Sequence, residues 1–228
     1  GYSARLSSQY SVNRIAISST LLKGGATLGS DMGSSAEDQC IIQHPTPGQD
    51  VVAADNLIPV DNAGGFPSKG FAFLQRGKDQ NGANINGPLG FSFTRANATE
   101  LKVTGWGLYG SATPVSIADA TAITLFGIPV NNFNAANYPP NMVVQIGDEW
   151  IGPVIYDNGH LVPTRRTGGV QMTGLPRNTF GVSGSGLHKA GEKVIQVIQV
   201  RNRNVRDGDV ITIIKADNTK EQMPVSYT

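Results

Sequence analysis

Only one cysteine, Cys40, occurs among the 228 residues, so no disulfide can form within the chain. It stands between Gln39 and two isoleucines, Ile41 and Ile42, in a short apolar run. A free cysteine in such surroundings behaves as a small buried hydrophobe. We therefore expect Cys40 to be a core residue, and the sequence leaves a reactive thiol open as the alternative.

Charged residues are also scarce, at 15% of the chain against roughly 25% in an average soluble domain. The 18 basic and 17 acidic residues nearly cancel, which leaves a net charge of +1. Such a balance provides no broad attraction to nucleic acid or to an anionic membrane. The chain contains no uninterrupted apolar run long enough for a spanning helix. We therefore expect neither nucleic acid nor membrane as a partner.

Sequence signatures of catalysis and metal binding are missing as well. The three histidines stand in no HExxH, CxxC or histidine-rich spacing; they are His44, His160 and His188. The segment GVSGSG contains Ser183 and Ser185, but it does not fit the G-x-S-x-G pattern of a nucleophile elbow. The sequence therefore predicts no catalytic residue, no metal site and no cofactor, and we expect that the protein is not an enzyme.

One glycine-rich segment has the spacing G-x-G-x-x-G, namely GWGLYG at residues 105–110, after a strand-like run. A dinucleotide site needs a helix that begins at the third glycine and an acidic residue about 20 positions later. Pro114 disfavours a helix directly after this segment, and no acidic residue occurs in 124–130. We expect instead that the glycines bend a sheet edge or corner and present Trp106 and Tyr109.

The 28 glycines and 13 prolines favour turns and short strands over helices. Residues 71–74 (FAFL) and 91–94 (FSFT) alternate, which predicts two strands, each with a Phe-x-Phe face turned toward the core. The connection between them, RGKDQNGANINGPLG at 76–90, is long for a hairpin. Long loops in compact domains often bind ligands or partners, and a tolerated surface excursion is the alternative.

Residues typical of turns indicate where further strands begin and end. The Asn158-Gly159 step predicts a hairpin between 154–156 and 160–162, because both residues tolerate positive φ. The best helical candidate, Ser116–Ala122, predicts one helical turn at most.

The last part of the chain predicts a three-strand antiparallel meander, over 193–205, 210–214 and 221–227. About ten to twelve short strands and almost no helix predict an all-β fold, an antiparallel β-sandwich or jelly-roll-like barrel with long loops. Residues 1–37, rich in Ser, Gly and Thr, predict an extended N-terminal arm that packs on something else, with a floppy terminus equally open. We expect 38–228 to form a single domain.

Two kinds of side chain are candidates for interface or ligand contacts. Arginines could pair with carboxylates of a neighbouring subunit through their planar fork, although a solvated face is the alternative. Aromatic rings could stack on sugars, although core positions are the alternative. The candidates are Trp106, Tyr109, Trp150, Tyr156, Arg165, Arg166, Arg201 and Arg203.

In its overall style, a near-neutral, Gly/Asn/Thr-rich β chain with long polar loops and an N-terminal arm, the whole chain resembles the structural proteins of virions, above all of bacteriophages. The resemblance is not tied to a motif, so it transfers no functional residue. It implies a homo-oligomer that contacts other virion proteins as a capsid, decoration, spike or tail component located in the virion. The alternative is a carbohydrate- or receptor-binding β-sandwich module, with a host surface glycan as partner.

Overall fold

The computed structural model describes residues 13–17, 25–135, 138, 140–165, 167, 169–181, 184, 186–200, 210–214 and 220–224. The chain divides into two compact units, 16–197 and the two ends 1–15 with 198–228. The fold is all-β, and the described residues contain short 3₁₀ turns but no α-helix. The predicted fold class is confirmed, and the main sheet does not close into a barrel. Within the same residues, no helix has the length and apolar character needed to cross a bilayer.

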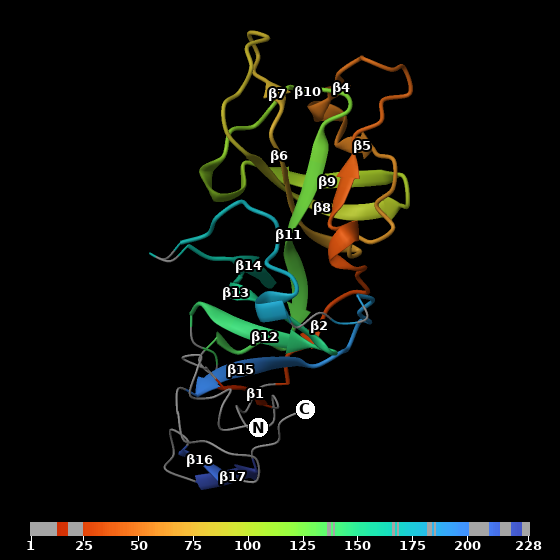
Figure 1. Ribbon diagram of the computed structural model, residues 1–228. Coiled ribbons are helices and arrows are strands. Elements are labelled where there is room, and N and C mark those ends of the chain that lie inside the picture. The colour runs from red at the N-terminus through yellow and green to blue at the C-terminus, as the bar shows by residue number, and fades with distance from the viewer. Residues whose placement is uncertain are drawn as a thin grey trace. The chain divides into compact units, whose positions relative to one another are not determined.

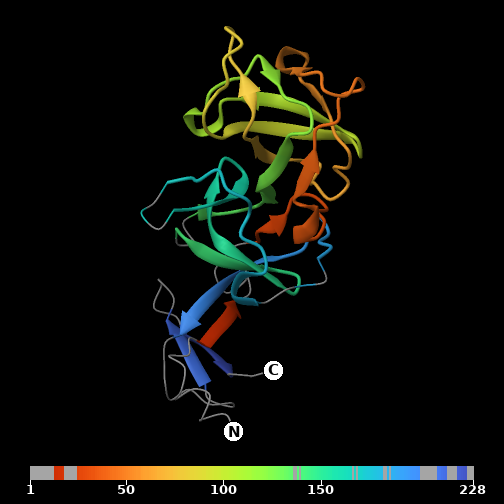
Figure 2. The same cartoon turned by 45° about the horizontal axis from the view of Figure 1, so that its top comes forward.

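The larger unit is built on one antiparallel sheet with the strand order β15-β12-β13-β14-β11-β6-β8-β9-β5, in which β2 and β3 also pair with β11. Its strands are β2 (Thr27–Leu28), β3 (Gln39–Ile41), β5 (Leu57–Pro59), β6 (Lys69–Leu74), β8 (Leu89–Asn97), β9 (Glu100–Trp106), β11 (Ala122–Asn131), β12 (Met142–Ile146), β13 (Glu149–Asp157), β14 (His160–Pro163) and β15 (Val194–Val200). Figure 2 shows the paired strands β8 and β9, in yellow-green, from a second direction.

Smaller elements complete the description. A three-stranded sheet is formed by β4 (Val51–Val52), β10 (Ser116–Ile117) and β7 (Gly77–Lys78), which lie together at the top of Figure 1. The 3₁₀ turns are η1 (Ser35–Glu37), η2 (Ala53–Asp55), η3 (Leu108–Gly110) and η5 (Thr179–Gly181). Near the chain ends lie β1 (Asn13–Ile17) and the hairpin of β16 (Val210–Ile214) and β17 (Lys220–Pro224).

Strand β11 belongs to both halves of the main sheet (Figure 1). Residues 122–127 pair with β3 and β6, whereas residues 128–131 pair with β14 and β2. The pairing with β6 shifts register between Leu125 and Gly127. Nearly every residue of β11 from Ile123 to Val130 is buried, because the strand is covered along its length.

The two predicted Phe-x-Phe strands are confirmed as β6 and β8, and they pair with each other. Ala72 lies opposite Phe91, and Phe71 lies opposite Ser92. Residues directly opposite each other share a face, so the two phenylalanine pairs point to opposite sides of the sheet. Phe91 and Phe93 enter the main core, whereas Phe71 packs in a second cluster with Phe126. Alternation fixes the faces within one strand, but only the register relates two strands.

Glycine is required where β6 passes between β11 and β8. A Cβ at Gly70 would lie 2.6 Å from the backbone oxygen of Gly127 and 3.1 Å from the ring of Phe93. We expect Gly70→Ala to lower the free energy of unfolding by roughly 1–3 kcal/mol, measured by urea denaturation, because the neighbouring backbone must move. The control is Gly25→Ala, where a new Cβ meets nothing within 4 Å. Equal stability of the two variants would contradict this account.

The hairpin predicted around Asn158-Gly159 is confirmed as β13 and β14, with Ile155 opposite Val162. Both turn residues have positive φ, 43° for Asn158 and 78° for Gly159, as this two-residue turn requires. Cys40 is buried, as predicted, and burial raises the pKa of its thiol to about 12. Cys40 is therefore a core residue.

The helical turn predicted in Ser116–Ala122 is wrong, because the segment forms β10, a turn and the start of β11. Ile117 is completely buried in the small sheet, which favours an extended backbone there. Asp119 holds the following turn, since its carboxylate accepts hydrogen bonds from the N–H groups of His44 and Gly48 at 2.8 Å each. Tertiary contacts thus override a weak helical preference.

The predicted C-terminal meander is confirmed only in part. Strands β16 and β17 form an antiparallel hairpin, but β15 pairs with β12 rather than with β16 in the described residues. Residues 201–209 lie outside the described residues, as do 1–12 and 18–24 of the predicted arm. From residue 25 onward that segment lies in the larger unit, where Ala26 and Leu28 are fully buried.

Candidate functional site

The GWGLYG segment does not form a nucleotide cradle. β9 ends at Trp106, Gly107 has a φ of 79°, and the 3₁₀ turn η3 follows with Tyr109 at a φ of 53°. Ser111 is already extended, so no α-helix begins after Gly110. The segment therefore lacks the helix N-terminus on which a pyrophosphate would rest. The glycines bend the chain after β9, as the sequence predicts.

The four predicted aromatic contacts are engaged by their own chain. The ring of Trp106 packs on Phe91 at a centroid distance of 4.9 Å, and Tyr156 stacks on Phe133 at 4.4 Å. The hydroxyl of Tyr109 donates a hydrogen bond to Asp157. The indole N–H of Trp150 donates to Gln145 at 3.2 Å. The structure does not bring the four rings together into one exposed platform.

The four predicted arginines can be placed only in part. Arg165 is exposed, in the loop after β14. Arg166, Arg201 and Arg203 lie outside the described residues, so their role in contacts stays a prediction.

The most highly organised group of polar side chains is a buried ionic network around Arg177, which the sequence does not reveal. Its guanidinium donates two parallel hydrogen bonds to the carboxylate of Glu149, at 2.7 and 2.8 Å, and a third to Asp38 at 2.9 Å. The side chains of Arg177 and Glu149 are only 3% and 1% exposed. This bidentate geometry is the strongest arrangement for an arginine–carboxylate pair.

His188 extends the network on the other side of Glu149. Its Nε2 lies 2.7 Å from Glu149 Oε2, and its Nδ1 lies 3.2 Å from Glu192 Oε2. With a carboxylate at each ring nitrogen, both nitrogens can donate only when the imidazole is protonated. The network thereby joins the residue after η1, the start of β13, the loop at 177 and the segment before β15.

The charges of the network are unevenly distributed. Burial would raise the pKa of Glu149, but hydrogen bonds from His188 and Arg177 outweigh it and lower the pKa to about 2. Burial raises the pKa of Asp38 to about 7, with Arg177 opposing and the negative charge of Glu149 adding to the effect. Burial would lower the pKa of His188, but its hydrogen bonds to Glu149 and Glu192 raise it. The negative charge is therefore concentrated on Glu149, and Asp38 binds a proton easily.

Each member of this network is bonded to another member, and the cluster holds four chain segments together. Its geometry indicates a structural role, namely an internal brace that links these segments by ion pairs and hydrogen bonds. The sequence gives no local signal for it, because Glu149 and Asp38 precede Arg177 by 28 and 139 positions.

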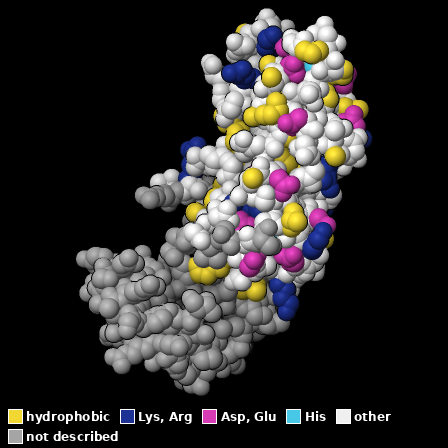
Figure 3. Space-filling view, turned by 45° about the vertical axis from the view of Figure 1, so that its right-hand side comes forward, with side chains coloured by type: hydrophobic (Ala, Val, Ile, Leu, Met, Phe, Trp, Pro, Cys, Tyr) yellow, Lys and Arg dark blue, Asp and Glu magenta, His cyan; other side chains and the backbone are white. Residues whose placement is uncertain are grey.

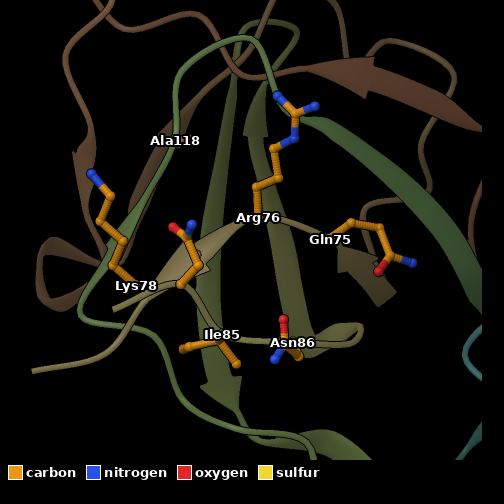
Figure 4. Close-up of a pocket in the computed structure, with 8 residues that line it drawn as sticks. Gln75, Arg76, Lys78, Ile85, Asn86 and Ala118 are labelled. Carbon is orange, nitrogen blue, oxygen red and sulfur yellow. The ribbon is translucent and has the colours of Figure 1, made fainter. Parts of the chain in front are cut away.

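A second polar group lines an open pocket of about 400 Å³ at the long loop between β6 and β8 (Figure 4). We call it the β7 pocket, since β7 and the returning segment of its hairpin form most of it. Its lining residues are Gln75, Arg76, Gly77, Lys78, Asn84, Ile85, Asn86 and Ala118. In Figure 4 the side chains of Gln75, Arg76 and Lys78 spread from one segment, while Ile85 and Asn86 come from the returning one.

The loop that carries the β7 pocket is internally hydrogen-bonded. Asp79 Oδ1 accepts from the backbone N–H groups of Asn81 and Ala83, at 2.8 and 2.9 Å. The N–H of Ile85 donates to the carbonyl of Gly77 at 2.9 Å. The loop is therefore a built hairpin, which gives the pocket a defined shape.

The polar groups of the β7 pocket are mostly unpaired. Lys78 forms an ion pair with Asp50 at 2.7 Å. Among the described residues, the guanidinium of Arg76 has no hydrogen-bond or ion-pair partner, and the same holds for the side-chain amides of Gln75, Asn84 and Asn86. The pocket thus offers one guanidinium without a carboxylate partner, three amides and the apolar side chain of Ile85.

Comparison of the chain with protein families, with curated proteins and with solved structures finds no match.

Proposed function

We propose that this protein is a structural, self-assembling subunit of a virion, of the capsid, decoration, spike or tail class. It acts through contacts between copies and with other virion proteins, and not through catalysis. The observation that supports this proposal best is a set of three exposed apolar side chains, on β4, on β5 and just before β10, which we call the apolar rim. Its members, Val52, Leu57 and Val115, are 51%, 42% and 46% exposed.

The apolar rim is a consequence of strand geometry. In the small sheet, Val51 and Ile117 lie opposite each other and are buried, so Val52 on the alternate face points outward. The carbonyl of Val115 accepts the N–H of Ala53 at 3.0 Å, which fixes Val115 beside β4. Leu57 begins β5, the last strand of the main sheet. We infer that these three side chains become buried at contacts between subunits.

The distribution of charge does not favour contacts driven by electrostatic attraction. On the face shown in Figure 3, acidic and basic side chains of the described residues are interspersed. The net charge of the whole chain is only +1. Association therefore depends on apolar burial and shape more than on long-range attraction.

We expect light scattering after size exclusion to show a discrete oligomer, and Val52→Asp with Leu57→Asp to weaken its association at least about tenfold. A charge on each of these positions must be desolvated at the contact. The control is Leu187→Asp, which changes an apolar side chain that is 64% exposed outside the apolar rim. Co-sedimentation of the chain with intact particles would support the virion assignment. A strict monomer at all concentrations, absent from particles, would overturn it.

A second candidate function is a carbohydrate- or receptor-binding module. The β7 pocket favours it, because polar side chains without partners in the chain line a pocket on a built loop. Such pockets bind hydroxyl-rich ligands through a few placed polar groups. The saccharide titration described below tests this function together with the class of ligand.

A further inference from the structure

We propose that the β7 pocket binds a carboxylate-bearing sugar. The inference deepens the second candidate function and rests on it. It is carried by the unpaired guanidinium of Arg76, by three side-chain amides and by the apolar side chain of Ile85, all of which line one pocket.

Arg76 indicates an anionic ligand. A guanidinium presents a planar fork of N–H donors that matches the two oxygens of a carboxylate. Arg177, the arginine of the buried network, already uses its fork on Glu149, whereas the fork of Arg76 has no acceptor among the described residues. Neighbouring acidic residues already have donors: Asp50 pairs with Lys78 and accepts the hydroxyl of Ser116 at 3.2 Å, and Asp79 accepts two backbone N–H groups. A carboxylate would therefore meet an uncompensated positive charge.

The remaining lining groups indicate a sugar ring. The amides of Gln75, Asn84 and Asn86 each carry both donors and an acceptor, which suits hydroxyl groups that also donate and accept. Ile85 is half-buried against the core and presents an apolar surface on which the C–H groups of a ring can pack. The volume of the β7 pocket, about 400 Å³, lies within the range of small-molecule sites.

The pocket needs little rearrangement to bind. Gly77 allows β7 to pack tightly, because a Cβ there would lie 2.6 Å from Leu89 and 3.0 Å from Pro114. The hairpin that follows is closed by Asp79, and Lys78 is held by Asp50 with further N–H donors left over. A backbone fixed in advance reduces the ordering cost of binding, which is then confined to the lining side chains.

The test is a titration of the full chain, followed by NMR or calorimetry, with methyl β-glucuronide and its neutral partner methyl β-glucoside. The two sugars differ only in a carboxylate against a hydroxymethyl group. We expect the glucuronide to bind at least about tenfold more tightly, as a charge-assisted hydrogen-bond pair implies. Inorganic phosphate is the third probe, because it tests for a general anion site.

Variants test whether the glucuronide binds in the β7 pocket. Arg76→Gln should weaken glucuronide binding about tenfold or more, Arg76→Lys should weaken it less, and Asn84→Ala should weaken both sugars. Arg165→Gln, at an exposed arginine elsewhere, should change nothing. Unchanged thermal unfolding of each variant shows that the fold is intact.

The outcomes separate this inference from the function on which it rests. Equal binding of the two sugars would overturn the carboxylate preference but keep a sugar-binding function. Phosphate that binds as tightly as the glucuronide would overturn the sugar class. No binding of any probe would overturn both. Glucuronide binding that Arg76→Gln leaves unchanged would overturn the assignment to this pocket.

Discussion

Replacing Arg177 with methionine is expected to lower the free energy of unfolding by about 3–5 kcal/mol, the loss found when one partner of a buried ion pair is removed. Methionine is similar in length but cannot donate hydrogen bonds. The carboxylate of Glu149 would lose two short hydrogen bonds, and Asp38 would lose its ion pair. The side chain of Glu149 is only 1% exposed, so water does not readily replace the donors that its carboxylate loses.

Chemical denaturation, followed by tryptophan fluorescence, measures this loss. Arg165→Met is the matched control, since the same change at an exposed arginine is expected to stay within about 0.5 kcal/mol. If Arg177→Met were as stable as that control, the network would contribute nothing net and its role as a brace would be wrong.

Stability is expected to be greatest in mildly acidic solution and to decline as the pH rises toward 8. The pKa of Asp38 is about 7 in the folded protein and 3.8 in the unfolded chain. Between these values the folded state binds a proton that the unfolded state has released, so stability falls as pH rises. The full difference corresponds to about 4 kcal/mol. The raised pKa of His188 acts in the same direction, since its contribution is present at low pH and lost as the imidazole deprotonates.

Glu149 limits stability on the acid side. Its pKa is about 2 in the folded protein against 4.5 in the unfolded chain, so its contribution is present above 4.5 and lost as pH falls toward 2. Denaturation curves from pH 3 to 8 should therefore pass through a maximum near pH 4, where the rise from Glu149 and the decline from Asp38 cancel. Asp38→Asn should flatten the decline above pH 5, because an amide does not titrate. A variant that declines as steeply as the parent would show that Asp38 is not the cause.

Local signals in the sequence were sufficient for much of the strand pattern. The Asn158-Gly159 step and the alternation in β6 and β8 each depend on residues close together in the chain. The relation between elements was not predictable in the same way. The Phe pairs of β6 and β8 point to opposite sides, because register decides which residues face each other. Likewise, nothing local in β11 indicates four pairing partners.

In the candidate site, too, features that depend on nearby residues could be predicted and features that depend on distant residues could not. The long loop at 76–90 could be predicted as a binding or contact segment from its length alone. The complete lining of the β7 pocket could not, because Ala118 comes from a distant segment. Aromatic contacts were predicted from residue type, but Trp106 and Tyr156 pack on their own chain. Arg177 gave no signal, because its partners are far away in the sequence.

The position of β11 also bears on how the larger unit unfolds. The same strand supplies hydrogen bonds to β3 and β6 at its beginning and to β14 and β2 at its end. Neither half of the sheet can separate without exposing part of this strand, whose side chains are buried from Ile123 to Val130 with few exceptions. Local opening of one half therefore costs contacts in the other. We therefore expect the larger unit to unfold as one cooperative unit, although its strands pair in two groups along β11.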